Sequence, residues 1–140
     1  MGVLAKPIPF GDYFLLEKLN TGGMAEVFKA KTFGAEGFER IVAVKKILPS
    51  IAEDKEFISM FINEAKLAVQ LNHANIAQIN DLGNINGDYY IAMEYVPGHD
   101  LRVIFDRCVR MNKKLDIGCV CYIMSKVTCR QQVLHQTACA

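Results

Sequence analysis

The stretch RIVAVKKIL, residues 40–48, decides the fold of this chain. It is rich in β-branched residues and is followed by Pro49, which predicts a strand that ends at the proline. Side chains alternate between the faces of a strand, so Lys45 and Lys46 point in opposite directions. Lys45 shares its face with the apolar residues Ile41, Ala43 and Ile47. Either its methylene stem packs while its ammonium reaches water, or its ammonium is held for a partner.

A long helix is expected directly after this strand, from about Ile51 to Leu71. Ser50 and Glu53 have the spacing of a capping box at its start. The helix carries an apolar stripe, and Glu64 falls in the middle of it; the stripe consists of Phe57, Phe61, Ala68 and Leu71.

Glu64 has two interpretations. It lies at the edge of the stripe with its oxygens in water, or it is covered and needs a cation, because an unpaired buried carboxylate is costly. A strand and the helix that follows it pack together, so Lys45 and Glu64 can meet between them.

The strand is preceded by a hairpin with the turn LNTGGMAEV, residues 19–27. The flanking segments 12–19 and 26–33 are aromatic and β-branched, which predicts two strands. Adjacent glycines often make an ordinary turn. Their bare backbone also allows a close approach to phosphate oxygens, which loop N–H groups can bind.

Two more strands are expected at 75–84 and 88–96, joined by the hairpin signal Asn86-Gly87. A helix is predicted from Leu101 to Met111 and another from near Asp116. The order of these elements predicts an α+β fold, in which a five-stranded antiparallel sheet is covered on one face by the long helix.

Composition excludes several classes of protein. The chain has 140 residues and a formal net charge of +1, which suits one domain without a nucleic-acid footprint. No apolar run reaches the roughly 18 residues that span a bilayer, and a cytoplasmic location is expected. The five cysteines argue against a disulfide framework. Zinc is the less favoured reading of Cys119-Val-Cys121 and His135, and no metal site is assigned.

Four motifs, in this order and at these separations, resemble the N-terminal lobe of eukaryotic-like serine/threonine protein kinases, above all the bacterial forms with a Gly-Gly-Met loop. LNTGGMAEV is similar to their glycine-rich loop and VAVK (42–45) to their lysine strand. FINEAKLAVQLNHANI resembles their glutamate-bearing helix and the turn after it, and YIAMEYVPGHDL their last strand and hinge.

The resemblance implies an ATP site. Lys45 would hold the α- and β-phosphates, oriented by Glu64. His73 and Asn75 would close the helix onto the fourth strand, and Lys46, on the opposite face, would be the less favoured ligand of the two lysines. The implied nucleotide-binding residues are Leu19, Asn20, Thr21, Gly22, Gly23, Met24, Ala25, Val27, Ala43, Lys45, Met93, Glu94, Val96 and Asp100. Among them, Leu19, Val27 and Ala43 would sandwich the adenine. Met93 would be the gatekeeper, Glu94 and Val96 would bond the adenine edge, and Asp100 would reach the ribose.

The sequence departs from the family pattern at two loop positions, Asn20 and Ala25, where glycine is usual. We expect a stiffer and weaker lid there. The implied organisation is an N-terminal extension (1–9), the nucleotide-binding lobe (10–96), the hinge with the start of the second lobe (97–127), and an unrelated tail (128–140). From Thr128 the apolar spacing of a helix is lost, which suggests a truncated or frameshifted kinase gene.

The His-Arg-Asp and Asp-Phe-Gly motifs are absent, and with them the catalytic Asp and the residues that would hold Mg²⁺. The family reaction is transfer of the ATP γ-phosphate to protein Ser or Thr, and the chain alone is expected to be inactive. The alternative is a non-catalytic nucleotide-binding pseudokinase or an interaction fragment. Apolar surface near Ile117–Val127 is expected to favour self-association.

Overall fold

The computed structural model describes the backbone of residues 2–138 and the side chains of residues 6–128. The chain forms two units. The first comprises Met1–Asn72 and Ala77–Tyr95, and the second comprises His73–Ile76 and Val96–Ala140.

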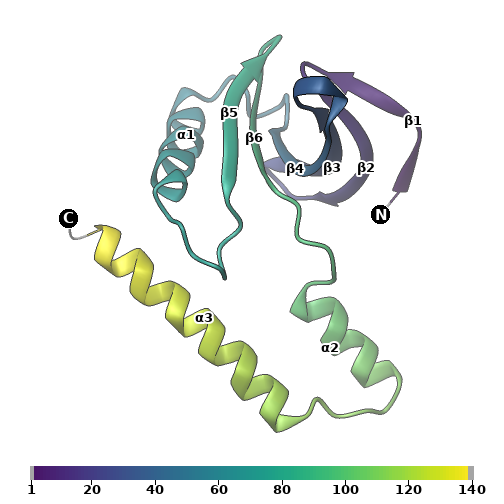
Figure 1. Cartoon of the computed structure of the whole chain (residues 1–140), viewed down its shortest axis with the longest axis vertical. Helices are drawn as coiled ribbons and strands as arrows, with labels where there is room; N and C mark the ends of the chain where they lie inside the picture. Colours follow the sequence, from purple (N-terminus) through teal and green to yellow (C-terminus); the bar gives the residue numbers. More distant parts are fainter. Residues whose placement is uncertain (1, 139–140) are drawn as a thin grey trace. The chain divides into compact units, whose positions relative to one another are not determined.

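The first unit is built on a six-stranded antiparallel sheet with the order β1-β2-β3-β4-β6-β5 (Figure 1). Its strands are β1 (Gly2–Phe10), β2 (Tyr13–Thr21), β3 (Ala25–Phe33), β4 (Glu39–Ile47), β5 (Ile79–Ile85) and β6 (Asp88–Glu94). A short 3-10 helix, η1 (Ala35–Gly37), joins β3 to β4. The turn between β5 and β6 has positive φ at Asn86 (54°) and Gly87 (93°), as expected of an Asn-Gly hairpin.

The sheet has one strand more than the sequence analysis expected. The sequence predicts only an N-terminal extension over residues 1–9, whereas Gly2–Phe10 pairs with β2 as the edge strand β1. The segment contains Pro7 and Pro9, which a strand tolerates at the edge of a sheet, where the missing N–H breaks no ladder. Phe10 anchors β1, because its side chain is buried and its ring meets that of Tyr90 edge-on at 5.4 Å.

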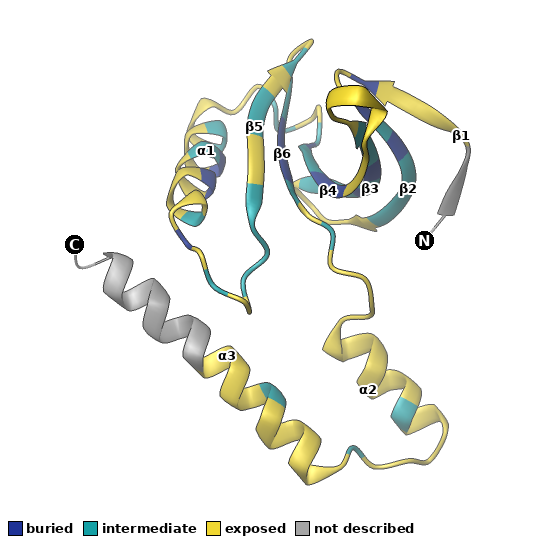
Figure 2. Cartoon of the chain, in the orientation of Figure 1, coloured by how far each residue is buried: buried dark blue, intermediate teal, exposed yellow. Residues whose placement is uncertain are grey.

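Two apolar cores lie on opposite faces of the sheet. One consists of Phe10, Tyr13, Leu15, Phe28, Ala30, Val42, Val44, Tyr90 and Ala92. The other lies under helix α1 (Lys55–Val69) and consists of Ile47, Phe61, Ala65 and Ile91, with half-buried neighbours that include Phe57 and Met93. Figure 2 shows the buried residues gathered in the central strands and along one side of α1. The sheet therefore separates two layers, and the face under α1 carries Lys45.

Helix α1 begins later than expected. Asp54 is its N-cap, with Oδ1 accepting from the N–H groups of Glu56 (3.0 Å) and Phe57 (3.1 Å). The capping box of Ser50 and Glu53 is wrong, because residues 48–54 form turns in which Ala52 N donates to Leu48 O. A carboxylate directly before the helix competes well for its free N–H groups.

The second unit contains α2 (Leu101–Arg110) and α3 (Ile117–Ala138). The expectation that the helix would not continue past Val127 is wrong for the backbone, since α3 extends to Ala138. The origin of residues 128–140 stays a prediction. Most described side chains of both helices are exposed (Figure 2). Among the described residues, no helix is long and apolar enough to cross a membrane.

Candidate functional site

The β2–β3 turn is tied to the strand that carries Lys45. Gly22 N donates to Ala25 O at 2.9 Å, which closes the hairpin. Leu48 N, just beyond the end of β4, donates to Met24 O at 3.1 Å. These bonds fix the tip of the loop over the end of β4, although its residues are themselves exposed.

The two loop glycines are not required by the fold. Neither Gly22 nor Gly23 has a positive φ. A Cβ added at Gly23 would meet nothing within 4 Å, and one at Gly22 would make an ordinary contact of 3.5 Å with Ala25 O. Asn20 also has no positive φ and lies in β2, so a residue other than glycine fits this position without backbone strain.

Four expected site residues share the face of the sheet under α1. In the strand register, Val27 lies beside Lys45, and Ala43 beside Met93. Residues two apart on β3 or β4 point to the same face, which brings the two rows together. Ala43 is 7% exposed, and its short side chain leaves room beside it on this face of the sheet. Leu19 lies in a β-bulge between Lys18 and Asn20.

Lys45 and Glu64 face each other between β4 and α1. The distance from Lys45 Nζ to Glu64 Oε1 is 4.0 Å, and the side chains are 31% and 70% exposed. Glu64 therefore lies at the edge of the apolar stripe, with its carboxylate in water, and forms a loose ion pair with Lys45. An exposed pair at this distance contributes little to stability.

A cavity of about 200 Å³ opens between the loop, β4 and α1. It is lined by Met24, Ala25, Lys45, Phe57, Met60, Phe61 and Glu64. Lys45 therefore borders the same space as Met24 and Ala25, which directly follow the two glycines of the turn. This arrangement can hold an anion between an ammonium and backbone N–H groups.

Lys46 lies on the other face, as the alternation predicted. Its Nζ is 2.7 Å from Asp88 Oδ2 and 5.3 Å from the centre of the Phe10 ring. A different cavity, of about 530 Å³, borders it on that face. Lys46 already has a close carboxylate, and it does not line the cavity beside Lys45.

Val96 and Asp100, the remaining expected site residues, belong to the second unit. Val96 is exposed, and Asp100 is the N-cap of α2, its Oδ1 accepting from Val103 N at 2.8 Å. In the same unit, Asn75 N donates to His73 Nδ1 at 3.0 Å and Asn75 Nδ2 to Lys126 O at 3.2 Å. His73 and Asn75 thus form a turn joined to α3, while Glu94 N bonds Gln78 O within the first unit.

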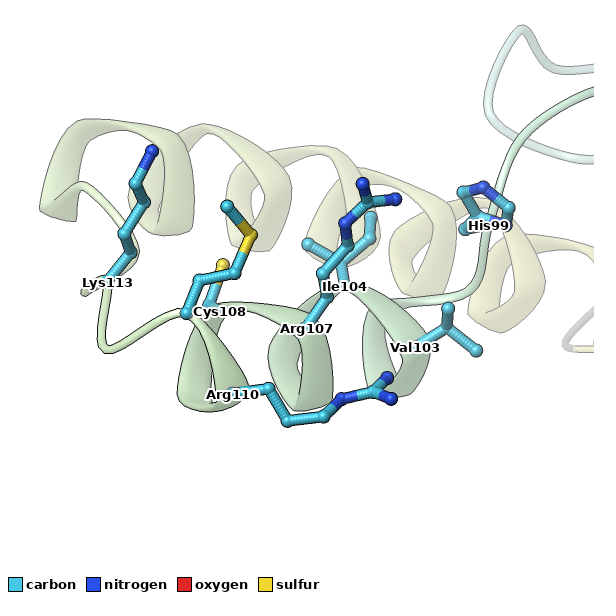
Figure 3. Close-up of a pocket in the computed structure, with 8 residues that line it drawn as sticks. His99, Val103, Ile104, Arg107, Cys108, Arg110 and Lys113 are labelled. Carbon is cyan, nitrogen blue, oxygen red and sulfur yellow. The ribbon is translucent and has the colours of Figure 1, made fainter.

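Another cavity, of about 620 Å³, lies along α2, and none of the expected site residues lines it. It is lined by His99, Val103, Ile104, Arg107, Cys108, Arg110, Met111 and Lys113, which Figure 3 shows on α2 and the segments at its two ends. Within the described part of the chain, no group of three His, Cys, Asp or Glu side chains could hold a metal ion. Cys108, Cys119 and Cys121 are free thiols.

The sequence does not predict a polar cluster formed by Tyr13, Asp81 and Tyr90. The hydroxyls of Tyr13 and Tyr90 both donate to Asp81 Oδ2, at 2.9 and 2.7 Å, and so join β2 and β6 to β5. Burial, and then the bond to Asp81, raises the pKa of Tyr90 to about 12 and raises the pKa of Tyr13 further. The sequence held no signal for this cluster, because it depends on how the sheet curls.

Residues 13–139 match the family model described as the protein kinase domain. The chain belongs to the protein kinase family. It is 52% identical over 92 residues to the tyrosine-protein kinase MasK of Myxococcus xanthus. It is 42% identical over 92 residues to the serine/threonine-protein kinase PrkC of Bacillus subtilis. Each alignment covers 66% of this chain and 14% of the relative.

The fold agrees with this assignment. A crystal structure of the PknI kinase domain of Mycobacterium tuberculosis superposes with a TM-score of 0.74 at 31% identity. That match covers 95% of this chain and 52% of the solved domain. The chain thus spans about half of a kinase domain and about a seventh of the curated relatives named above. The resemblance read from the four motifs is confirmed, and so is the α+β kinase-lobe fold, with six strands in place of five.

Proposed function

We propose that this chain is the ATP-binding lobe of a serine/threonine protein kinase. The observation that carries the proposal is the position of Lys45, which lines a cavity together with Glu64 and with Met24 at the end of the glycine turn. The fold accounts for neither the cation on this apolar face nor the two glycines above it. A triphosphate accounts for both.

The residues present fit the nucleotide. Lys45 would bind the α- and β-phosphates, and the backbone of residues 20–25 would cover them. Leu19, Val27 and Ala43 would contact the adenine in front of Met93. Glu94 and Val96 would bond its edge through their backbone, and Asp100 would reach the ribose with the carboxylate oxygen that does not cap α2. ATP, when bound, supplies the phosphoryl group.

For this chain by itself we propose nucleotide binding without phosphoryl transfer. Magnesium needs carboxylate oxygens beside the phosphates, and transfer needs an acid that orients the attacking hydroxyl. The described residues contain no suitable cluster, and the sequence has neither His-Arg-Asp nor Asp-Phe-Gly. This observation favours the non-catalytic module as the second candidate function.

Isothermal titration with ATP tests the proposal. Lys45→Met should weaken binding about tenfold or more, because a charge-assisted bond to phosphate is lost. Lys46→Met is the matched control, since it removes a neighbouring lysine from the other face and should leave the affinity unchanged. Equal ATP affinity for wild type and Lys45→Met would refute the proposed site.

Specificity for Ser or Thr rests on the likeness to PrkC and PknI, whereas MasK is named a tyrosine kinase. The genomic DNA beyond codon 127 should be read in all three frames. If codons for His-Arg-Asp and Asp-Phe-Gly appear in a shifted frame, the restored protein can be incubated with labelled ATP. Phosphoserine or phosphothreonine in its products supports the proposal, and phosphotyrosine alone contradicts it.

A cytoplasmic location and self-association through the second unit complete the proposal. The described side chains of α3 include several large exposed apolar residues, such as Ile117 (79%) and Tyr122 (65%). Exposed apolar residues gathered on one element commonly mark an association surface.

A further inference from the structure

Lys45 has a second neighbour on α1, and it is more rigid than Glu64. The ammonium lies 5.5 Å from the centre of the Phe61 ring, within the range of a cation–π interaction. Phe61 is 3% exposed and packs in the core with Ile47, Ala65 and Ile91. Glu64, in contrast, is 4.0 Å away with a side chain that is 70% exposed.

The two neighbours also differ in what they do to the charge of the lysine. A carboxylate neutralises the ammonium, whereas the face of an aromatic ring attracts a cation without carrying a net charge. A lysine held mainly by a ring keeps its positive charge for an anion in the adjoining cavity. The core holds the ring in place, so the attraction does not depend on ordering a flexible side chain.

We propose that Phe61 is a positioning residue for Lys45, which holds the ammonium toward the cavity even when Glu64 is displaced. The inference rests on the proposed function, in which Lys45 binds the phosphates of ATP. It assigns to the helix a second group besides its glutamate, one turn away, that prepares the lysine for the nucleotide.

Phe57 provides a matched control. It lies on the same helix one turn earlier, packs against the same core and lines the same cavity. The described side chains show no cation over the Phe57 ring; Lys45 lies over Phe61 alone. Phe61→Leu and Phe57→Leu therefore make the same chemical change, and only the first removes the ring from under Lys45.

Two readouts on the 140-residue chain test the proposal. Nuclear magnetic resonance of ¹³C-lysine-labelled protein reports the Lys45 Hε signals, assigned by their loss in Lys45→Arg. A ring face shifts these signals upfield. We expect the upfield shift to disappear in Phe61→Leu and to persist in Phe57→Leu and in Glu64→Gln. ATP affinity should fall about three- to tenfold in Phe61→Leu, beyond any change in Phe57→Leu.

The outcomes separate this inference from the proposed function. An unchanged Lys45 signal in Phe61→Leu overturns the positioning role, and so does loss of the upfield shift in Glu64→Gln. The second variant keeps the test valid if Phe61→Leu fails to fold, because Glu64 is exposed. If the Lys45 signal responds to Phe61 while Lys45→Met binds ATP like wild type, the ring does hold the lysine and the proposed nucleotide site is wrong.

Discussion

Replacing Asp81 by alanine should destabilise the first unit by removing the shared acceptor of two tyrosines. Asp81 Oδ2 receives hydrogen bonds from Tyr13 and Tyr90, whose residues are 8% and 7% exposed. A hydrogen bond to a charged group contributes about 1.5–3 kcal/mol to the free energy of unfolding, and a buried donor left without an acceptor costs about 1–3 kcal/mol. Asp81 is itself exposed, so water replaces part of the loss. We expect a net cost of about 2 kcal/mol, measured by urea denaturation at pH 8.

The matched variant removes both donors instead of the acceptor. Tyr13→Phe with Tyr90→Phe leaves the Asp81 carboxylate free in water, where it is well solvated, and the rings still pack. Its cost should be about 1 kcal/mol or less, because no buried polar group is left without a partner. Wild type should therefore be the most stable, followed by the double phenylalanine variant and then by Asp81→Ala. This order is expected because only Asp81→Ala leaves buried hydroxyl groups without an acceptor.

The pH dependence has a definite sign. An unfolded tyrosine titrates near pH 10, whereas the pKa of folded Tyr90 is raised to about 12 and that of Tyr13 is raised further. The protonated hydroxyls are therefore favoured by folding. Their contribution is complete below pH 10 and is lost as the pH rises from 10 towards 12, at roughly 1.4 kcal/mol per pH unit for each tyrosine. The double phenylalanine variant should lack this part of the slope. If wild type and the double variant lost stability in parallel between pH 10 and pH 11, the reasoning would be refuted.

Three further predictions follow from the geometry. Gly23→Ala should leave the midpoint of thermal unfolding unchanged or slightly higher, since the added Cβ meets nothing within 4 Å. The same variant should bind ATP several-fold more weakly. A lower midpoint with normal ATP affinity would contradict the role assigned to the loop. Gly83→Ala should lower the free energy of unfolding by about 1–3 kcal/mol in urea melts, because the added Cβ would lie 2.8 Å from Tyr90 Cε1. Gly87→Ser is the control: its position is open but has φ 93°, so its cost measures backbone strain without steric overlap. The chain should form oligomers as its concentration rises in analytical ultracentrifugation, and Tyr122→Glu should reduce them; a monomer at all concentrations argues against association through α3.

The placement of the two lysines could be predicted from the sequence because strand alternation is a local property. Alternation predicts that Lys45 and Lys46 lie on opposite faces, and the structure pairs them with Glu64 and Asp88 on opposite sides of the sheet. The Asn86-Gly87 hairpin is equally local, since its positive φ values suit these two residues.

The start of α1 and the strand β1 could not be predicted from the sequence, for different reasons. Ser50 and Asp54 are both good N-caps, and the choice between them depends on how residues 48–54 turn back to the sheet. Segment Gly2–Phe10 holds Pro7 and Pro9, so only its edge position, a tertiary property, makes it a strand.

Distances between elements also required the structure. The helix stripe identified Phe61 and Glu64, but the rotation of α1 over the sheet decides which of them lies under the ammonium of Lys45. The same holds for Asp81, which looked like an ordinary polar residue in a strand until the curl of the sheet brought Tyr13 and Tyr90 to it. The adenine edge and ribose contacts of Glu94, Val96 and Asp100 stay predictions.

The most direct measurement is to identify the lysine that an acyl-phosphate derivative of ATP modifies. Such a reagent binds as a nucleotide and acylates the amine beside its phosphates, and mass spectrometry of peptides from the full chain locates the added group. We predict that Lys45 carries the label, that excess ATP removes it, and that Lys46 stays unmodified. Labelling spread over the exposed lysines and undiminished by ATP would contradict the nucleotide site.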